Sequence, residues 1–318
     1  MSGATLRGGC APQSNLPRSF ANTHHRCYRS SVGPVRFAFK TSTQNTTWAD
    51  MLAVWRAADE IEVYESGWTF DHFYPIFADP SGPCLEGWTT LTALAQATTR
   101  LRLGVLVTGI HHRHPAVLAN MAAALDIISG GRLELGVGAG WNEQESQAYG
   151  IELGGLKERF DRFEEACQVL IGLLSQETTD FEGRFYRLTA ARNEPKGPQR
   201  PHPPICIGGN GEKRTLRITA KYAQHWNFVG GTPAEFARKR DVLKAHCADV
   251  GRNPKEIMLS AHLRLDPERG HRGVIEDAIA LGAEGLDLAI VYLPTPHDPA
   301  ALEPLAEAIR DSGLWRPA

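Results

Sequence analysis

From residue 35 onward, short apolar runs of strand character alternate with segments of helical period. Apolar residues three and four apart indicate a helix, whereas short apolar runs bounded by turn residues indicate buried strands. We therefore expect strands at residues 35–40, 62–70, 101–108, 133–137, 204–207, 225–228, 257–262 and 286–292. The expected helices are 48–58, 87–98, 116–128, 157–174, 213–222, 233–250, 272–281 and 299–311.

Eight strand–helix repeats in about 280 residues match the number and size of a (β/α)8 TIM barrel, an α/β fold. Short insertions are expected after the second and fourth strands and after the fourth helix, the last a hairpin at residues 181–188. A doubly wound open sheet is the alternative. Its Gly-x-Gly-x-x-Gly fingerprint should follow the first strand, where this chain has Lys-Thr-Ser-Thr-Gln.

Residues 1–34 differ from the rest of the chain. They contain four arginines, no acidic residue and no apolar period, so we expect a disordered extension before a barrel domain at 35–318. A transit peptide would share this composition but would be amphipathic. We favour the hypothesis that the start is over-extended, with translation beginning at Val35.

Composition narrows the class of protein. The formal net charge of −2 and the lack of a basic run argue against a nucleic-acid partner. No apolar run is long enough to span a bilayer, so no membrane partner is expected. The cysteines are scattered without a Cys-x-x-Cys pair, which indicates reduced thiols and a cytoplasmic protein (Cys10, Cys27, Cys84, Cys167, Cys206 and Cys247).

In a barrel, the chemistry belongs at the carboxyl ends of the strands. The fourth strand ends in a glycine-rich turn within residues 133–145, where the backbone can approach a flat or phosphorylated ligand closely. Asp71 and His72 follow the second strand, and an imidazole near a carboxylate either shuttles protons or fixes its own loop.

Two further clusters follow later strands. His111, His112 and His114 resemble a metal cluster, but no acid or cysteine stands at ligand spacing, so we expect no metal. The segment 208–211 is rich in glycine and runs into Lys213 and Arg214 at a helix start, which favours an anion site for a phosphate.

Several motifs at these positions together resemble the luciferase-like monooxygenase superfamily, and within it the oxidoreductases that use the deazaflavin coenzyme F420. The matching stretches, which lie within residues 35–231, are Phe-Ala-Phe-Lys-Thr-Ser at 37–42, Ser-Gly-Trp-Thr-Phe-Asp-His-Phe at 66–73, Leu-Gly-Val-Leu-Val-Thr at 103–108, His-Arg-His-Pro-Ala-Val-Leu-Ala at 112–119, Gly-Gly-Arg-Leu-Glu-Leu-Gly-Val-Gly-Ala-Gly-Trp-Asn-Glu at 130–143 and Pro-Ile-Cys-Ile-Gly-Gly at 204–209.

The resemblance implies roles for individual residues. His72 matches a histidine proposed to exchange a proton, and Asp71 an acid near the deazaflavin ring. Leu106 and Val107 fall where the family has a non-prolyl cis peptide behind the ring. The full implied cofactor set is Asp71, Leu106, Val107, Thr108, Ala139, Gly140, Trp141, Asn142, Gly208, Gly209, Asn210, Gly211, Val229, Gly230 and Gly231.

Two positions depart from the sugar-phosphate dehydrogenases of the family. Ile76 replaces a tryptophan and Trp141 a catalytic glutamate, which argues against sugar-phosphate oxidation and for a flatter or more apolar substrate. The resemblance implies hydride transfer between coenzyme F420 and a small organic molecule, and pairing into a homodimer. An FMN-dependent monooxygenase and a non-catalytic flavin-binding barrel remain alternatives.

Overall fold

The computed structural model describes residues 33–77 and 79–316, together with Met1. The extension predicted at residues 1–34 lies almost entirely outside these residues, so its disorder stays a prediction. The barrel is described below by itself.

Eight parallel strands of the described chain form a closed barrel. Each strand pairs with the next along the chain, and the pairs β1–β11 and β3–β5 complete the circle. The barrel strands are β1 (Arg36–Lys40), β2 (Tyr64–Thr69), β3 (Arg102–Val105), β5 (Leu133–Gly138), β8 (Ile205–Gly208), β9 (His225–Phe228), β10 (Met258–Arg264) and β11 (Leu288–Tyr292). The predicted (β/α)8 TIM barrel is confirmed, and the open sheet is wrong.

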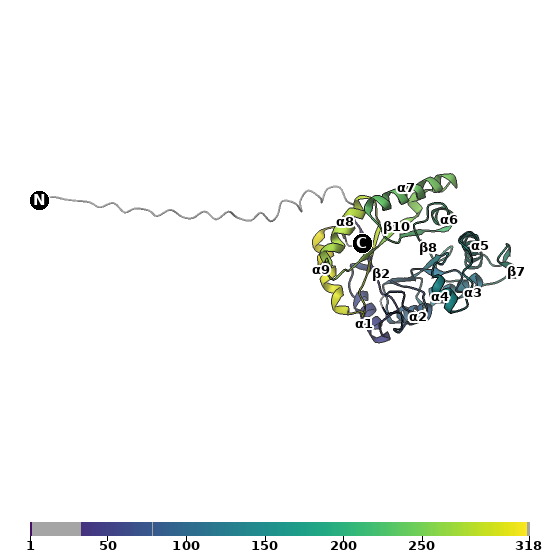
Figure 1. Cartoon of the computed structure of the whole chain (residues 1–318), viewed down its shortest axis with the longest axis horizontal. Coiled ribbons are helices and arrows are strands. Elements are labelled where there is room, and N and C mark those ends of the chain that lie inside the picture. Colours follow the sequence, from purple (N-terminus) through teal and green to yellow (C-terminus); the bar gives the residue numbers. More distant parts are fainter. Residues whose placement is uncertain (2–32, 78, 317–318) are drawn as a thin grey trace. The chain divides into compact units, whose positions relative to one another are not determined.

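Helices surround these strands (Figure 1). They are α1 (Trp48–Asp59), α2 (Gly87–Ala97), α3 (Pro115–Ile128), α5 (Leu156–Ser175), α6 (Thr215–Tyr222), α7 (Pro233–Asp249), α8 (Gly270–Ala283) and α9 (Leu302–Ser312), with short 3₁₀ turns η2 (Pro254–Glu256) and η3 (Pro299–Ala301). Local sequence sets several starts. Thr47 and Thr232 each form a capping box with the acid at the third helical position, and Pro115 occupies the first position of α3.

The predicted insertions are present. The connection after β5 contains a short helix, α4 (Glu143–Ala148), that the sequence pattern did not predict. After α5, β6 (Thr179–Glu182) and β7 (Arg187–Ala191) pair antiparallel, so the hairpin predicted at 181–188 exists with longer arms. No helix among the described residues is long and apolar enough to cross a membrane.

Strand alternation separates an outer core from the barrel interior. On β1, Phe37 and Phe39 pack outward, and Phe39 meets Trp55 of α1 edge-to-face at 5.3 Å between ring centroids. Ala38 points to the interior, where it joins a second apolar cluster with Trp68, Leu106, Cys206, Leu288 and Ile290. Lys40 is therefore an inward position near the carboxyl end of its strand.

Cys167, Cys206 and Cys247 are buried free thiols, and Cys84 is half-buried.

One extra residue interrupts the third strand. Leu103 pairs with Leu133 on β5, whereas Thr108 in the continuation β4 (Thr108–Gly109) pairs with Val137. Five steps on one strand thus oppose four on the other, which is a bulge. The Leu106–Val107 peptide within it is cis, as the resemblance implied. The bulge places Leu106 and Val107 against the cavity described below.

A buried polar network connects four barrel strands near their amino-terminal ends. Glu134 accepts hydrogen bonds from Arg102 Nε at 2.9 Å and binds His225 Nδ1 at 2.9 Å. His225 Nε2 in turn lies 2.6 Å from the Ser260 hydroxyl. The network joins β3, β5, β9 and β10 well below the carboxyl ends of the strands, the end of such a barrel that serves stability.

Candidate active site

A cavity of about 780 Å³ opens at the carboxyl ends of the barrel strands. That volume lies in the range of small-molecule and cofactor pockets. Most of the predicted site residues line it: Asp71, His72, Leu106, Val107, Ala139, Gly140, Trp141, Asn142, Gly208, Gly209, Asn210, Val229 and Gly230. Strand ends that are far apart along the chain thus line one cavity, and their role in binding a cofactor stays a prediction.

Three predicted cofactor positions, Thr108, Gly211 and Gly231, do not line this cavity. The Thr108 hydroxyl accepts a hydrogen bond from Trp88 Nε1 at 2.8 Å. A Cβ on Gly211 would lie 2.8 Å from the Thr215 hydroxyl, and one on Gly231 would meet the Phe228 ring at 2.9 Å. These residues shape the loops that carry the lining residues.

Asp71 is buried and paired with an arginine. Its carboxylate binds Arg113 through two contacts of 2.5 and 3.0 Å, and Arg113 also donates to Glu86 at 2.7 Å. Burial opposes ionisation of Asp71, but hydrogen bonds and charge from His112 and Arg113 prevail and lower its pKa to about 2. Asp71 is therefore an ionised anchor that fixes the loop carrying His72.

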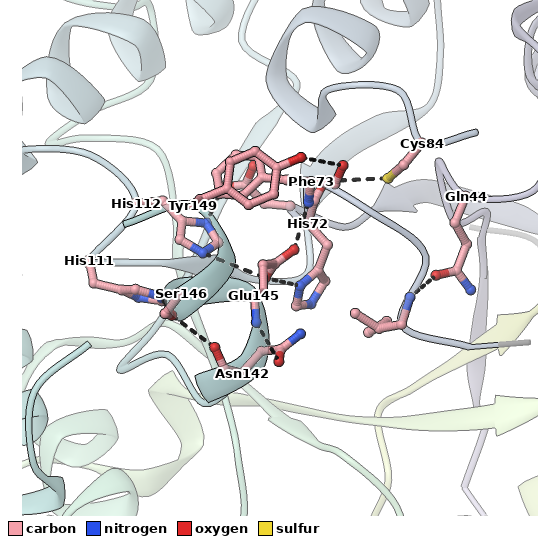
Figure 2. A network of polar contacts seen from close by, with 12 residues as sticks. Gln44, His72, Phe73, Cys84, His111, His112, Asn142, Glu145, Ser146 and Tyr149 are labelled. Atoms are coloured by element: carbon pink, nitrogen blue, oxygen red, sulfur yellow. Dashed lines mark hydrogen bonds and ion pairs between the residues drawn. The ribbon is translucent and has the colours of Figure 1, made fainter. Parts of the chain in front are cut away.

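The carboxylate that binds His72 is Glu145, not the neighbouring Asp71. His72 Nδ1 lies 2.7 Å from Glu145 Oε2, and the Phe73 backbone N–H donates to Oε1 at 2.7 Å (Figure 2). A carboxylate on Nδ1 selects the tautomer with the proton there and leaves Nε2 to exchange a proton. Burial opposes ionisation of Glu145, but the hydrogen bonds from His72 and Phe73 prevail and lower its pKa.

Glu145 reaches His72 because of an incomplete helix cap. Asn142 caps α4 by accepting from the Glu145 backbone N–H at 3.2 Å, which places Glu145 at the third helical position. An acid there commonly reaches back to its own cap, as Glu235 does in α7. In α4 the Glu145 side chain turns to His72 and Phe73 instead.

His112 lies between the two carboxylates. Its Nδ1 is 3.6 Å from Asp71 Oδ2 and its Nε2 is 3.9 Å from Glu145 Oε2, so Asp71, His112, Glu145 and His72 form a continuous polar row. The neighbouring His111 contacts the Ser146 hydroxyl at 3.2 Å, and burial and the charge of His112 lower its pKa to about 3. Within the described residues, no group of three or more His, Cys, Asp or Glu side chains could hold a metal ion.

The glycines at the end of β5 leave space for neighbouring groups of the protein itself. A Cβ on Gly136 would collide with the Val105 carbonyl at 1.8 Å, one on Gly138 would meet Val107 at 2.9 Å, and one on Gly140 would meet His111 at 2.4 Å. These glycines therefore admit the bulged strand and His111, and Gly138 and Gly140 also line the cavity. Trp141 is 62% exposed, with its ring centroid 5.9 Å from that of His72, so it stands at the cavity mouth.

The predicted anion site after β8 is only partly as expected. Gly209 has a φ of 132°, which only glycine adopts readily, and the Gly209–Asn210 turn lines the cavity ahead of α6. Arg214, expected to face the anion, instead pairs with Asp161 at 2.7 Å and lies over the Phe160 ring. Backbone groups and the positive end of α6 thus remain as the anion-binding features.

The cavity fits a flat heterocycle with polar edges. Leu106 and Val107 of the bulge give it an apolar wall, and Asn227 Oδ1 and His262 Nε2 are buried polar atoms in its lining without a hydrogen-bond partner among the described residues. Unpaired buried polar atoms are costly, so they indicate a ligand that supplies their partners.

Comparison with known proteins gives the relatives of this chain. A family model described as luciferase-like monooxygenase matches residues 31–271. The phthiodiolone/phenolphthiodiolone dimycocerosates ketoreductase of Mycobacterium tuberculosis is 32% identical over 211 residues, which cover 63% of this chain and 54% of that protein. An FMNH2-dependent dimethylsulfone monooxygenase of Pseudomonas putida is 32% identical over 197 residues, covering 61% of this chain and 53% of that protein. The chain thus spans about half the length of these relatives.

A solved structure agrees in fold. The F420-dependent secondary alcohol dehydrogenase in complex with an F420-acetone adduct superposes with a TM-score of 0.78 at 17% identity, covering 88% of this chain and 99% of that one. At this identity the likeness concerns the barrel alone.

Proposed function

Because the chain belongs to the luciferase-like monooxygenase family, we propose that it is an oxidoreductase that binds coenzyme F420 and acts on a small organic substrate. The observation that carries the proposal is the His72–Glu145 pair, which faces a cavity with an apolar wall from Leu106 and Val107. A bound deazaflavin supplies two-electron chemistry by hydride transfer. The remaining steps belong to the protein.

His72 moves the proton. Its Nδ1 is held by Glu145, so Nε2 is the nitrogen that gives a proton to, or takes one from, the substrate oxygen. Leu106 and Val107 would hold the ring from one face, and Ala139, Gly140, Trp141 and Asn142 would contact its edge. The turn at Gly208–Asn210, with Val229 and Gly230, lines the cavity and would hold the cofactor's phosphate-bearing tail. Trp141 at the mouth excludes water.

A specific observation keeps FMN as the second candidate, with oxygen insertion as the reaction. A relative of equal identity is named as FMNH2-dependent, and the helix end at α6 suits the phosphate of either cofactor. The presence of the His72–Glu145 pair favours the reaction that needs a positioned proton donor or acceptor, which is carbonyl–alcohol interconversion.

Titration of the full chain with F420 and, separately, with FMN tests the proposal. We expect F420 to quench tryptophan fluorescence, because Trp141 lies on the cavity wall. We also expect the Kd for F420 to be lower than the Kd for FMN. Tighter binding of FMN would transfer the proposal to the monooxygenase. Tight F420 binding without oxidation of reduced F420 by any member of a panel of ketones and aldehydes would favour a non-catalytic barrel.

His72→Ala tests the proton role. With a substrate from that panel, we expect the rate to fall roughly 10²- to 10⁴-fold while the Kd for F420 stays unchanged. His271→Ala, on α8 outside the cavity lining, is the matched control. Unchanged turnover in His72→Ala with intact F420 binding would remove the proton role.

A further inference from the structure

The cavity wall formed by β1, β11 and β10 carries positive charge that the proposed chemistry does not use. β1, β11 and β10 run side by side in register, with Lys40 opposite Tyr292 and Tyr292 opposite Arg264. All three residues line the cavity. They stand in one layer at the carboxyl ends of these strands because side chains of matched position point to the same side of a parallel sheet.

Lys40 is a buried cation with spare donors. It is 5% exposed, and its Nζ donates to the Leu106 carbonyl at 2.8 Å and lies 5.2 Å from the Tyr292 ring centroid. An ammonium has three N–H donors, so one bond leaves two for a ligand. Burial and the charge of Arg264 lower the pKa of Lys40 to about 7.

Arg264 is held in place by aromatic rings rather than by an acid. Its guanidinium carbon lies 5.6 Å from the centroid of Tyr292 and 5.4 Å from that of Phe77. Stacking on ring faces leaves the edge of the guanidinium plane, with its N–H groups, open for a planar acceptor.

A third polar side chain lies one layer deeper. His262 is two residues before Arg264 on β10, and its buried Nε2 has no hydrogen-bond partner among the described residues. Burial and the charges of Lys40 and Arg264 lower the pKa of His262 well below its usual value. His262 is therefore neutral, and the repulsion between the neighbouring cations Lys40 and Arg264 would be relieved by a negative charge.

The acids nearby already have partners. Asp277 binds Arg269 through contacts of 2.9 and 2.8 Å, and Asp266 accepts the backbone N–H groups of Glu268 and Arg269. Across the cavity Asp71 is paired with Arg113. Among the described residues, no carboxylate forms an ion pair with Lys40 or Arg264, so both cations are free to bind a ligand.

We propose that Lys40 and Arg264 form a binding site for the anionic group of the substrate, a carboxylate or a phosphate. Arg264 binds the anion edge-on at the cavity mouth, and Lys40 contacts it from the interior. That the anion belongs to a substrate rests on the proposed function. The site places the anionic end of the molecule on the β1, β10 and β11 wall and the reacting carbon toward His72.

Calorimetric titration of the cofactor-free full chain with benzoate and with benzamide tests the site. The two probes share size and ring and differ in charge. At pH 6.5 and low salt we expect benzoate to bind at least roughly tenfold tighter than benzamide, and Arg264→Gln and Lys40→Met each to weaken benzoate roughly ten- to a hundredfold. Arg272→Gln removes the same charge from an exposed part of α8 and is expected to change nothing.

A pH series adds a second readout. Besides Arg264 and His262, the groups that face Lys40 are the Tyr292 ring, the Cys206 thiol and the Leu106 carbonyl. The charged form of Lys40 is lost as pH rises through about 7, so benzoate affinity is expected to fall between pH 6.5 and 8.5 in the wild type. In Lys40→Met this fall is expected to disappear.

Each outcome decides the proposal. Equal affinity for benzoate and benzamide, or an Arg264→Gln variant that binds benzoate like the wild type, would overturn it. Arg264 is exposed, so that variant remains informative even where Lys40→Met fails to fold. Repeating the titration with F420 or FMN bound separates the two sources of an anion. Retained benzoate binding supports a substrate site, whereas its loss, with weaker cofactor binding by Arg264→Gln, would assign the cations to the cofactor phosphate.

None of these titrations depends on turnover. Absence of benzoate binding would therefore leave the oxidoreductase proposal standing. Failure of both F420 and FMN to bind would leave an anion-binding wall in a barrel of another chemistry.

Discussion

Glu145 is the residue whose role could be seen only in three dimensions. It lies 73 positions from His72 in sequence, yet its Oε2 is 2.7 Å from His72 Nδ1. Trp141, four residues earlier, occupies the position where the sugar-phosphate dehydrogenases of the family have a catalytic glutamate. The structure places a carboxylate from α4 beside His72, so the proposed acid–base role of His72 does not require a glutamate at position 141.

Glu145→Gln is expected to lower turnover roughly 10- to 100-fold, because an amide holds the His72 Nδ1–H more weakly and stabilises no positive charge. The measurement is the pH–rate profile together with the Kd for F420. We expect the profile to change shape and the Kd to stay. Glu143→Gln, exposed on the same helix, is the control. A uniform drop in rate at every pH would argue for a merely structural role.

A sequence signal for Glu145 did exist. Asn142 followed by Glu145 is a helix-start pattern, a capping residue with an acid three positions later. It predicts α4, and with it the placement of Glu145 on the face beneath Asn142. It does not predict that the Glu145 side chain binds His72 instead of the Asn142 backbone N–H, because that depends on where the loop after β2 lies. The Arg113–Asp71 pair was hidden for the same reason.

At the scale of elements, α4 is the weakest part of the site. It has six residues, far fewer than an isolated helix needs, and its start depends on the Asn142 cap. Strand positions were predictable from apolar runs because burial alone fixes them. Short elements such as α4 and β4 were missed because tertiary contacts, rather than local periodicity, hold them.

Asn142→Ala is expected to cost about 1 kcal/mol of stability and to lower activity by more than that loss explains, because α4 no longer presents Glu145. Asn253→Ala makes the same change at the cap of η2, on the helix-to-strand side of the barrel. It is expected to lower stability similarly and leave activity unchanged. Unfolding by denaturant and turnover at fixed F420 saturation are the measurements. Equal activity in both variants would contradict this view of α4.

For the whole molecule, stability and chemistry occupy opposite ends of the barrel. The network of Glu134, Arg102, His225 and Ser260 joins four strands away from the cavity. Burial opposes ionisation of Glu134, but hydrogen bonds and charge from His225 and Arg102 prevail and lower its pKa to about 2. Its contribution to stability is therefore fully present above about pH 4.5 and is lost as pH falls toward 2.

Glu134→Gln is expected to destabilise the protein at pH 7 by on the order of 3 kcal/mol, because Arg102 loses its buried counter-charge and His225 loses a charged hydrogen-bond partner. Between pH 4.5 and pH 3 the wild type is expected to lose stability more steeply than the variant, so the two curves converge. Urea unfolding at several pH values measures this. Parallel curves over that range would exclude Glu134 as the titrating group.

The fold as a whole was predictable from sequence, and the reason is the repetition of one unit. Eight repeats over this length leave few closed arrangements, and strand ends then converge on one face. The predicted barrel, its insertions and most of the cavity wall followed from that logic. Contacts between side chains could not be predicted in this way. Arg214 binds Asp161, and Lys40 and Arg264 lie on either side of Tyr292 because their strands pair in register, which no local sequence pattern encodes.

The position of Glu145 on α4 also affects how such a protein can evolve. The carboxylate beside His72 is carried by a six-residue helix in the connection from β5 to α5, outside the closed circle of strands. Lengthening, shortening or replacing that connection would alter the acid–base group without disturbing any strand pair. Descendants of one barrel could in this way exchange one reaction for another while inheriting the same strands and the same cavity wall.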